Sequence, residues 1–262
     1  MPPQARSGVA LRVSPGWGEH AENGPEAELL YAAVWGDTDA VKALLAEAPR
    51  LGVNAADTAG NTALMRAANG GYSEMVTALL AAPGLDVNAA DRFGWTALMR
   101  AADRGHSVTI TALLAAPGLD VNVANANGQT AFMRAANLGG HAETVIALLA
   151  APGLDVNAAN GNGQMALMRW ADRGRTEIVT ALLAYPGVDV NAADGDGRTA
   201  RALARARGHV RIASLLRADR RYSRLYAPTS TLTTKLGDTL KGTALSICRG
   251  GCAAVCVHRL CE

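Results

Sequence analysis

Apolar residues return along the chain with a helical period, and the same pattern occurs four times. Residues at positions i, i+3 and i+4 are apolar, which predicts amphipathic helices of about ten residues. The sets are Val76, Leu79 and Leu80; Ile110, Leu113 and Leu114; Val145, Leu148 and Leu149; and Val179, Leu182 and Leu183. Helices this short are not stable alone, so we expect each to pack against its own copies.

A ten-residue segment is copied almost without change. Leu-Leu-Ala-Ala-Pro-Gly-Leu-Asp-Val-Asn begins at Leu79, Leu113 and Leu148, and a near copy begins at Leu182. The spacings are 34, 35 and 34 residues, which indicates a supersecondary unit stacked many times. Such a stack offers an extended binding surface and no deep pocket.

Polar turns separate the helical segments. Each of five units opens with an Asx-x-x-Gly turn, at residues 57–60, 91–94, 125–128, 160–163 and 194–197. The Asp or Asn caps its own backbone and the Gly supplies a positive φ. A following Thr is placed to cap a first helix, and Gly71, Gly105 and Gly174 are placed to end one. The pattern predicts a turn–helix–helix cycle.

This cycle resembles the ankyrin repeat over residues 25–218. The family pattern Asp-x-x-Gly-x-Thr-Pro-Leu-His-x-Ala-Ala recurs with Ala in place of Pro and Met in place of His. The resemblance implies an all-α solenoid of stacked helix–turn–helix units with short hairpin-like turns. Because that His normally bonds across repeats in the family, we expect cohesion to depend more on packing by Met. The methionines are Met65, Met99, Met133 and Met168.

The repeat boundaries divide the chain into three parts. We expect a disordered segment over residues 1–24, an ankyrin-repeat domain over 25–219, and a disordered basic tail with cysteines over 220–262. Pro25 suits the first position of a helix in an N-terminal cap, and the Arg-rich last unit suits a C-terminal cap. The cap spans 25–52, and the repeats span 53–86, 87–120, 121–155, 156–189 and 190–219.

Charge and cysteines narrow the cellular setting. The 262 residues carry a net charge of +2, but nine Arg and a single acid lie between Arg198 and Arg224. No signal peptide is evident, and no apolar stretch approaches the ~20 residues of a spanning helix. All four cysteines lie in the last fifteen residues, unlike those of a disulfide-stapled secreted fold. We expect a cytoplasmic protein, with a nuclear or membrane-peripheral location as the alternatives.

One turn carries two aromatic residues, Phe93 and Trp95. The ankyrin resemblance implies that partners bind the turn tips and the exposed side of the first helices, which line a concave face. Aromatic anchors dominate interface energetics, so we expect these two to bind a partner. The alternative is that one of them packs locally against the neighbouring turn. The expected partner-binding residues are Arg92, Phe93, Trp95, Arg100, Arg104, Arg134, Arg169 and Trp170.

An arginine follows the methionine in four units, and we call Arg66, Arg100, Arg134 and Arg169 the arginine row. Stacked helices about 8–10 Å apart would align them as a positive stripe suited to an acidic partner. The alternative is neutralisation on the same helix, because an aspartate lies three residues after two of these arginines. The aspartates are Asp103 and Asp172.

The repeats are least regular in the middle. Gly139-Gly140 adds one residue, Met165 replaces the capping Thr, and Trp170 replaces a close-packing Ala. An indole there must displace a neighbour or turn toward the groove. Both a specialised groove floor and drift in a redundant copy fit this pattern.

The tail contains Cys248, Cys252, Cys256 and Cys261 with His258. It lacks the paired spacing of structural zinc sites, and the pattern leaves S-acylated, metal-binding and inert cysteines as alternatives. The histidines in the repeats are placed to begin helices, and no catalytic, cofactor or metal site is evident. We therefore expect a monomeric, non-enzymatic scaffold or adaptor that binds a protein and neither small molecules nor nucleic acid. The alternative is a peripheral membrane adaptor tethered by the tail.

Overall fold

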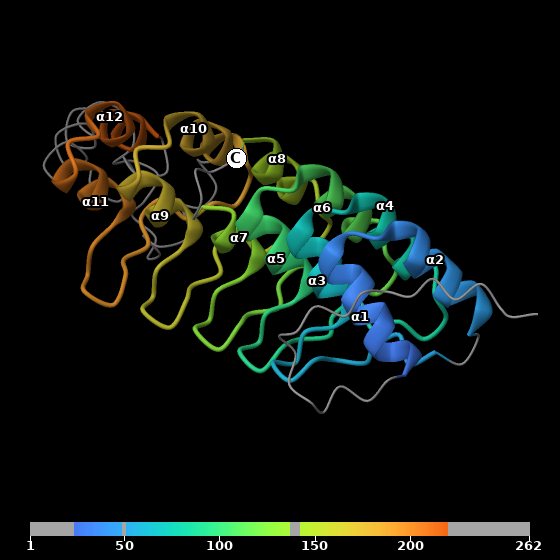
Figure 1. Cartoon of the computed structure of the whole chain (residues 1–262). Helices are drawn as coiled ribbons and strands as arrows, with labels where there is room; N and C mark the ends of the chain where they lie inside the picture. Colours follow the sequence, from blue (N-terminus) through green and yellow to red (C-terminus); the bar gives the residue numbers. More distant parts are fainter. Residues whose placement is uncertain (1–23, 49–50, 137–141, 220–262) are drawn as a thin grey trace, which may run out of the picture. The chain divides into compact units, whose positions relative to one another are not determined.

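The computed structural model describes residues 24–48, 51–136 and 142–219. These residues form twelve α-helices and no extended strand (Figure 1). The helices are α1 (Pro25–Trp35), α2 (Thr38–Glu47), α3 (Ala63–Gly70), α4 (Ser73–Leu80), α5 (Ala97–Arg104), α6 (Ser107–Leu114), α7 (Ala131–Arg134), α8 (Ala142–Leu149), α9 (Ala166–Asp172), α10 (Thr176–Ala184), α11 (Ala200–Ala206) and α12 (Val210–Ala218). The all-α prediction is confirmed.

The chain divides into two compact units, Met1–Ala166 and Leu167–Glu262. In the first unit the odd-numbered helices α1, α3, α5 and α7 pack side by side as one layer. The even-numbered helices α2, α4, α6 and α8 form a second layer beside it (Figure 1). In the second unit α11 packs on α12, and α12 also contacts α10.

The first helices bury the side chains that the repeat pattern assigned to packing. Met65, Met99 and Met133 are each at most 1% exposed, and the Ala pairs beside them are also buried. On the second helices Val76, Leu79 and their counterparts are fully buried. The methionines are therefore part of the buried core, in agreement with the packing role that the sequence predicts.

The first helices α3 and α5 begin and end as expected. The hydroxyls of Thr62, Thr96 and Thr130 accept a hydrogen bond from the N–H three residues later, at 3.3–3.4 Å. Gly71 and Gly105 end α3 and α5 in the left-handed region, with φ of 74° and 78°. Helix α7 keeps only residues 131–134, and the Gly139-Gly140 step lies outside the described residues.

Polar groups, in addition to packing, join successive repeats. The side chain of Asn54 donates to Gly84 O and accepts from Asp86 N–H, each at 2.8 Å. Asn88 and Asn122 hold the next loops in the same way. His106, the N-cap residue of α6, also lies 3.1 Å from Asn69 O of the preceding repeat.

The candidate partner-binding surface

The turn of the second repeat is held rigidly by one carboxylate. Asp91 Oδ1 accepts hydrogen bonds from the N–H groups of Phe93 and Trp95, at 2.8 and 2.9 Å. Gly94 has a φ of 77°, and a Cβ there would lie 2.9 Å from Asn125 Cα in the next turn. Only glycine fits both the backbone conformation and the close approach.

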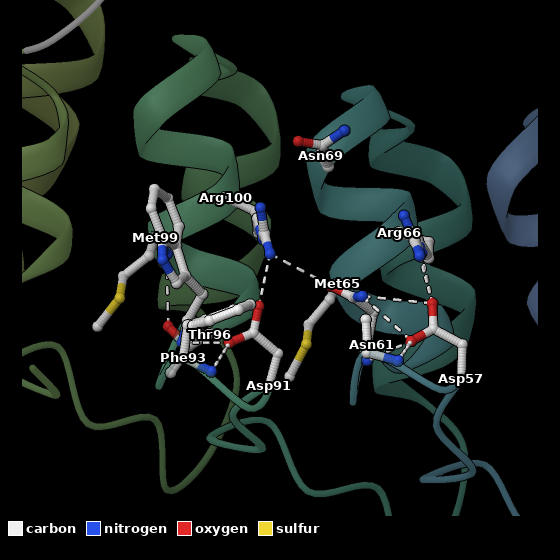
Figure 2. Close-up of polar contacts among 12 residues, drawn as sticks. Asp57, Asn61, Met65, Arg66, Asn69, Asp91, Phe93, Thr96, Met99 and Arg100 are labelled. Carbon is white, nitrogen blue, oxygen red and sulfur yellow. Dashed lines mark hydrogen bonds and ion pairs between the residues drawn. The ribbon is translucent and has the colours of Figure 1, made fainter. Parts of the chain in front are cut away.

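Phe93 projects from this fixed turn. Its side chain is 66% exposed, while its carbonyl accepts a hydrogen bond from Ala126 N–H in the next turn, at 3.0 Å. Figure 2 shows the backbone near Phe93 joined to the Asp91 carboxylate. The turn therefore presents an aromatic ring to solvent from a backbone bonded on both sides.

Trp95 behaves differently, because it packs within the stack. Its half-buried indole contacts two guanidinium groups, with Arg100 Cζ 4.7 Å and Arg134 Cζ 4.2 Å from the ring centroid. Both distances fit cation–π contacts. Trp95 thus packs locally, whereas Phe93 is exposed to solvent.

Three members of the arginine row pair with carboxylates of the protein itself. Arg66 bonds Asp57 and Arg100 bonds Asp91, each in its own turn (Figure 2). Arg100 also reaches Asn61 of the preceding repeat at 3.3 Å. These arginines are therefore not a free cationic stripe.

Arg134, the third of them, makes its ion pair across a repeat boundary. It bonds Asp103 of the preceding repeat at 2.6 Å and Gln129 at 2.9 Å. The predicted pairing of Arg100 with Asp103 on one helix is therefore wrong. The cause lies in the turn of the third repeat, where Asn125 replaces the aspartate and its amide offers Arg134 no second carboxylate oxygen.

The asparagine at position 125 leaves two buried N–H donors without an acceptor among the described residues. Asn125 Oδ1 accepts from the N–H groups of Asn127 and Gln129, at 3.0 and 2.9 Å, which turns its Nδ2 the other way. Neither that Nδ2 nor Arg134 Nε has a hydrogen-bond partner among the described residues. In the first repeat, Asp57 Oδ2 accepts the equivalent Arg66 Nε at 3.1 Å.

The Asp57 carboxylate shows how these turns favour charge. Burial by itself would raise the pKa of Asp57, but hydrogen bonds from the Arg66 side chain, Asn61 and Ala59 N–H outweigh it. The pKa of Asp57 therefore lies below its ordinary value of 3.8. Asp194 in the second unit also has a lowered pKa, because bonds from Arg198 and Asp196 N–H outweigh its burial.

Two expected residues are exposed and make no ion pair within the described parts of the chain. Arg92 lies beside Phe93 on the turn, and Arg104 lies at the last position of α5. Arg104 Nε donates only to the neutral Asn69 side chain, at 3.3 Å. Their positive charges are therefore available to a partner.

Trp170 requires a correction. Its side chain in α9 is 0% exposed, so it contacts no partner in this conformation and we remove it from the candidate surface. The indole turns into the interior, where burying its large apolar area is favourable. Arg169 on the same helix is half-buried, and the Asp172 predicted to pair with it bonds Arg207 at 2.9 Å.

Sequence reasoning missed the polar residues that organise the arginines. Asn61, Asn69 and Gln129 each accept from an arginine. The change from Asp57 and Asp91 to Asn125 at the first turn position was the signal for this, because a carboxylate gives an arginine a charge-assisted hydrogen bond and an amide does not.

The remaining expectations concern metal binding, membrane association and the two terminal segments. Within the described ranges, no three His, Cys, Asp or Glu side chains are grouped to hold a metal ion. Of the helices over residues 24–48, 51–136 and 142–219, none is long and apolar enough to cross a membrane. The cysteine tail and the N-terminal segment up to residue 23 lie outside the described residues.

Family models describe the repeats directly. A model of ankyrin repeats in three copies matches residues 83–160 and 140–224, and a model of ankyrin repeats in many copies matches residues 44–101. No curated protein matches the chain significantly.

Solved structures show the same architecture. The ankyrin repeat protein EF0377 is 29% identical with a TM-score of 0.68, over 74% of this chain and 98% of that one. An ankyrin repeat domain from Acinetobacter baumannii AYE is 35% identical with a TM-score of 0.64, over 72% and 95%. The third structure is a complex of the predatory endopeptidase Bd0816 from Bdellovibrio bacteriovorus with the immunity protein Bd3460. One chain of it is 31% identical with a TM-score of 0.62, over 72% and 96%.

Proposed function

Because the chain belongs to the ankyrin repeat family, whose members are generally protein–protein interaction modules, we propose that it is a non-enzymatic adaptor with Phe93 as its main anchor. The binding surface consists of Arg92, Phe93 and Arg104, supported by Trp95, Arg100 and Arg134. The single observation that carries the proposal is the 66% exposure of Phe93 on a turn whose backbone is bonded on both sides.

Preorganisation is the physical basis of the proposal. Binding loses free energy when a loop or side chain must first be ordered, and this turn is already ordered by Asp91 and Ala126. An exposed aromatic ring also loses unfavourable contact with water when a partner covers it. Most of the free energy gained by burying the Phe93 ring can therefore appear as binding affinity.

The surrounding charges favour an acidic partner. Arg92 and Arg104 are exposed and make no ion pair within the described residues, whereas Arg66, Arg100 and Arg134 are neutralised by carboxylates of the chain itself. Complementary charge raises association rates and selects partners more than it adds raw affinity. The proposed partner thus covers Phe93 with apolar side chains and places carboxylates near Arg92 and Arg104.

The test is affinity capture of the full chain from its native cell, with quantitative mass spectrometry. Phe93→Ala should lower recovery of the specific partner at least tenfold, as truncation of an interface anchor of about 2 kcal/mol does. Ile146→Ala is the matched control, because Ile146 is 59% exposed on α8, away from the turn. Unchanged recovery with Phe93→Ala, at an unaltered circular dichroism spectrum, would refute the anchor.

A further inference from the structure

The two units carry opposite charge. The described part of the first unit has thirteen acidic and six basic residues, which gives a net charge of −7. The described part of the second unit has nine arginines and six acids, a net charge of +3. A net charge of +2 for the whole chain conceals this asymmetry.

At the C-terminal end, arginines replace the residues that stack one repeat on the next. Arg205 in α11 stands where α3 has the buried Ala68, and Arg217 in α12 stands where α4 has the half-buried Leu80. Arg211 is the second residue of α12. All three side chains are exposed, and none makes an ion pair within the described residues.

The N-terminal end has the opposite chemistry. Glu28 in α1 and both Asp39 and Glu47 in α2 are exposed, and none of them makes an ion pair with a described residue. Lys42, the only basic residue of these two helices, is already paired with Glu74 in α4 at 2.5 Å. Exposed small side chains lie between the charges at both ends, so the ends can approach closely. They are Ala43 and Ala46 at the first end and Ala202, Ala206, Ser214 and Ala218 at the second.

We propose that copies of this chain associate head to tail, with α1 and α2 of one copy covering α11 and α12 of the next. Asp39 and Arg211 are each the second residue of an even-numbered helix. In the register of the repeats, Glu74, the second residue of α4, pairs with Lys42, the fifth residue of α2. Stacking one copy on another in this register therefore places Asp39 over Ser214, which lies three residues from both Arg211 and Arg217. This association uses neither Phe93 nor Arg92 and is independent of the proposed partner site. It differs from the expectation of a monomer.

The geometry determines the form of the assembly. The two surfaces are different, so the contact is heterologous and a copy bound at one end leaves its other end open. Head-to-tail contacts of this kind add further copies and build a ring where the rotation closes or an open chain where it does not. Exposed charges are screened by salt over about 8 Å at physiological ionic strength, so the assembly should form at low salt and dissociate at high salt.

Sedimentation velocity of the full chain tests the proposal. Between about 5 and 200 µM in 20 mM NaCl, the average sedimentation coefficient should rise continuously with concentration, and in 500 mM NaCl it should remain that of the monomer. Arg205→Glu/Arg211→Glu/Arg217→Glu should abolish the rise, and so should Glu28→Arg/Asp39→Arg/Glu47→Arg. An equimolar mixture of these two variants restores opposite charges at both junctions and should restore the rise.

Single substitutions separate position from net charge. Arg211→Glu should weaken association several-fold, whereas Arg175→Glu, an exposed charge that begins the inner helix α10, should leave it nearly unchanged. A monomeric sedimentation coefficient at 200 µM in 20 mM NaCl would overturn the proposal. So would a rise that persists in either triple variant, or equal effects of Arg211→Glu and Arg175→Glu. Circular dichroism confirms that each variant is folded.

Discussion

The turns of the second and third repeats differ in one functional group, and that group redirects an arginine. In the second repeat Asp91 supports the turn backbone with Oδ1 and holds Arg100 with Oδ2, at 2.5 Å. In the third repeat Asn125 makes the same two backbone contacts but offers an amide in the other position. Arg134 consequently bonds Asp103 of the second repeat.

The difference teaches how a repeat protein acquires a local feature without a new fold. Arg134 reaches back across the boundary, and its guanidinium lies 4.2 Å from the centroid of the Trp95 ring. The indole thus packs against two guanidinium groups, and Phe93 is the exposed aromatic of the pair. Losing one carboxylate in the third repeat thus shapes the surface of the second.

The largest expected effect comes from truncating the first residue of each turn. Asp91→Ala leaves two backbone N–H groups and the partly buried Arg100 without their acceptor, so we expect a loss of about 3 kcal/mol in unfolding free energy. Asn125→Ala removes only Oδ1, the acceptor for the N–H groups of Asn127 and Gln129, for which we expect a loss of about 1–2 kcal/mol. Urea denaturation followed by circular dichroism measures both. Equal losses would contradict the distinction between the two turns.

Much of the fold was predictable from sequence because its determinants are local. The Thr caps, the terminating glycines and the apolar spacing of each helix act within a few residues, and the structure confirms them. The hydrogen bonds of Asn54, Asn88 and Asn122 to the next loop were not predicted. Their partners lie 30 or 31 residues away, and no local rule identifies them.

The candidate surface was predictable in position but not in detail. The pair Phe93 and Trp95 was found from its place in a turn, but the packing of Trp95 against Arg134, a residue of the next repeat, was not predicted. Same-helix spacing suggested the wrong ion pair for Asp103, because a neighbouring repeat competes for the same carboxylate. Trp170 was misplaced since nothing local says whether the helix turns an indole inward.

Acid should weaken the first turn by less than truncation does, because a protonated Asp57 keeps both oxygens. The pKa of Asp57 is lowered in the fold, so its stabilisation is complete above the ordinary value of 3.8 and is lost as the pH falls through the lower folded value. We therefore expect the stability difference between wild type and Asp57→Asn to shrink as the pH falls from about 5 to about 2.

Urea denaturation across that pH range measures the difference. Arg66→Ala removes the side-chain hydrogen bond that lowers this pKa, so in its background Asp57→Asn should show a weaker pH dependence. A difference that is independent of pH in the presence of Arg66 would contradict the coupling. The loss of pH dependence in the Arg66→Ala background therefore measures how strongly Arg66 is bound to the Asp57 carboxylate.

The smallest expected effect is a gain of stability from making the third turn like the second. Asn125→Asp replaces the buried Nδ2, which has no partner among the described residues, with an acceptor for Arg134 Nε, so we expect about 1 kcal/mol of added unfolding free energy. The double-mutant cycle with Arg134→Ala isolates this contact, and a coupling energy near zero would show that Arg134 stays with Asp103. If Arg134 instead leaves Asp103 for the new carboxylate, Trp95 loses its cation–π contact with Arg134. The second repeat should then lose the packing of Trp95 against two guanidinium groups that distinguishes it.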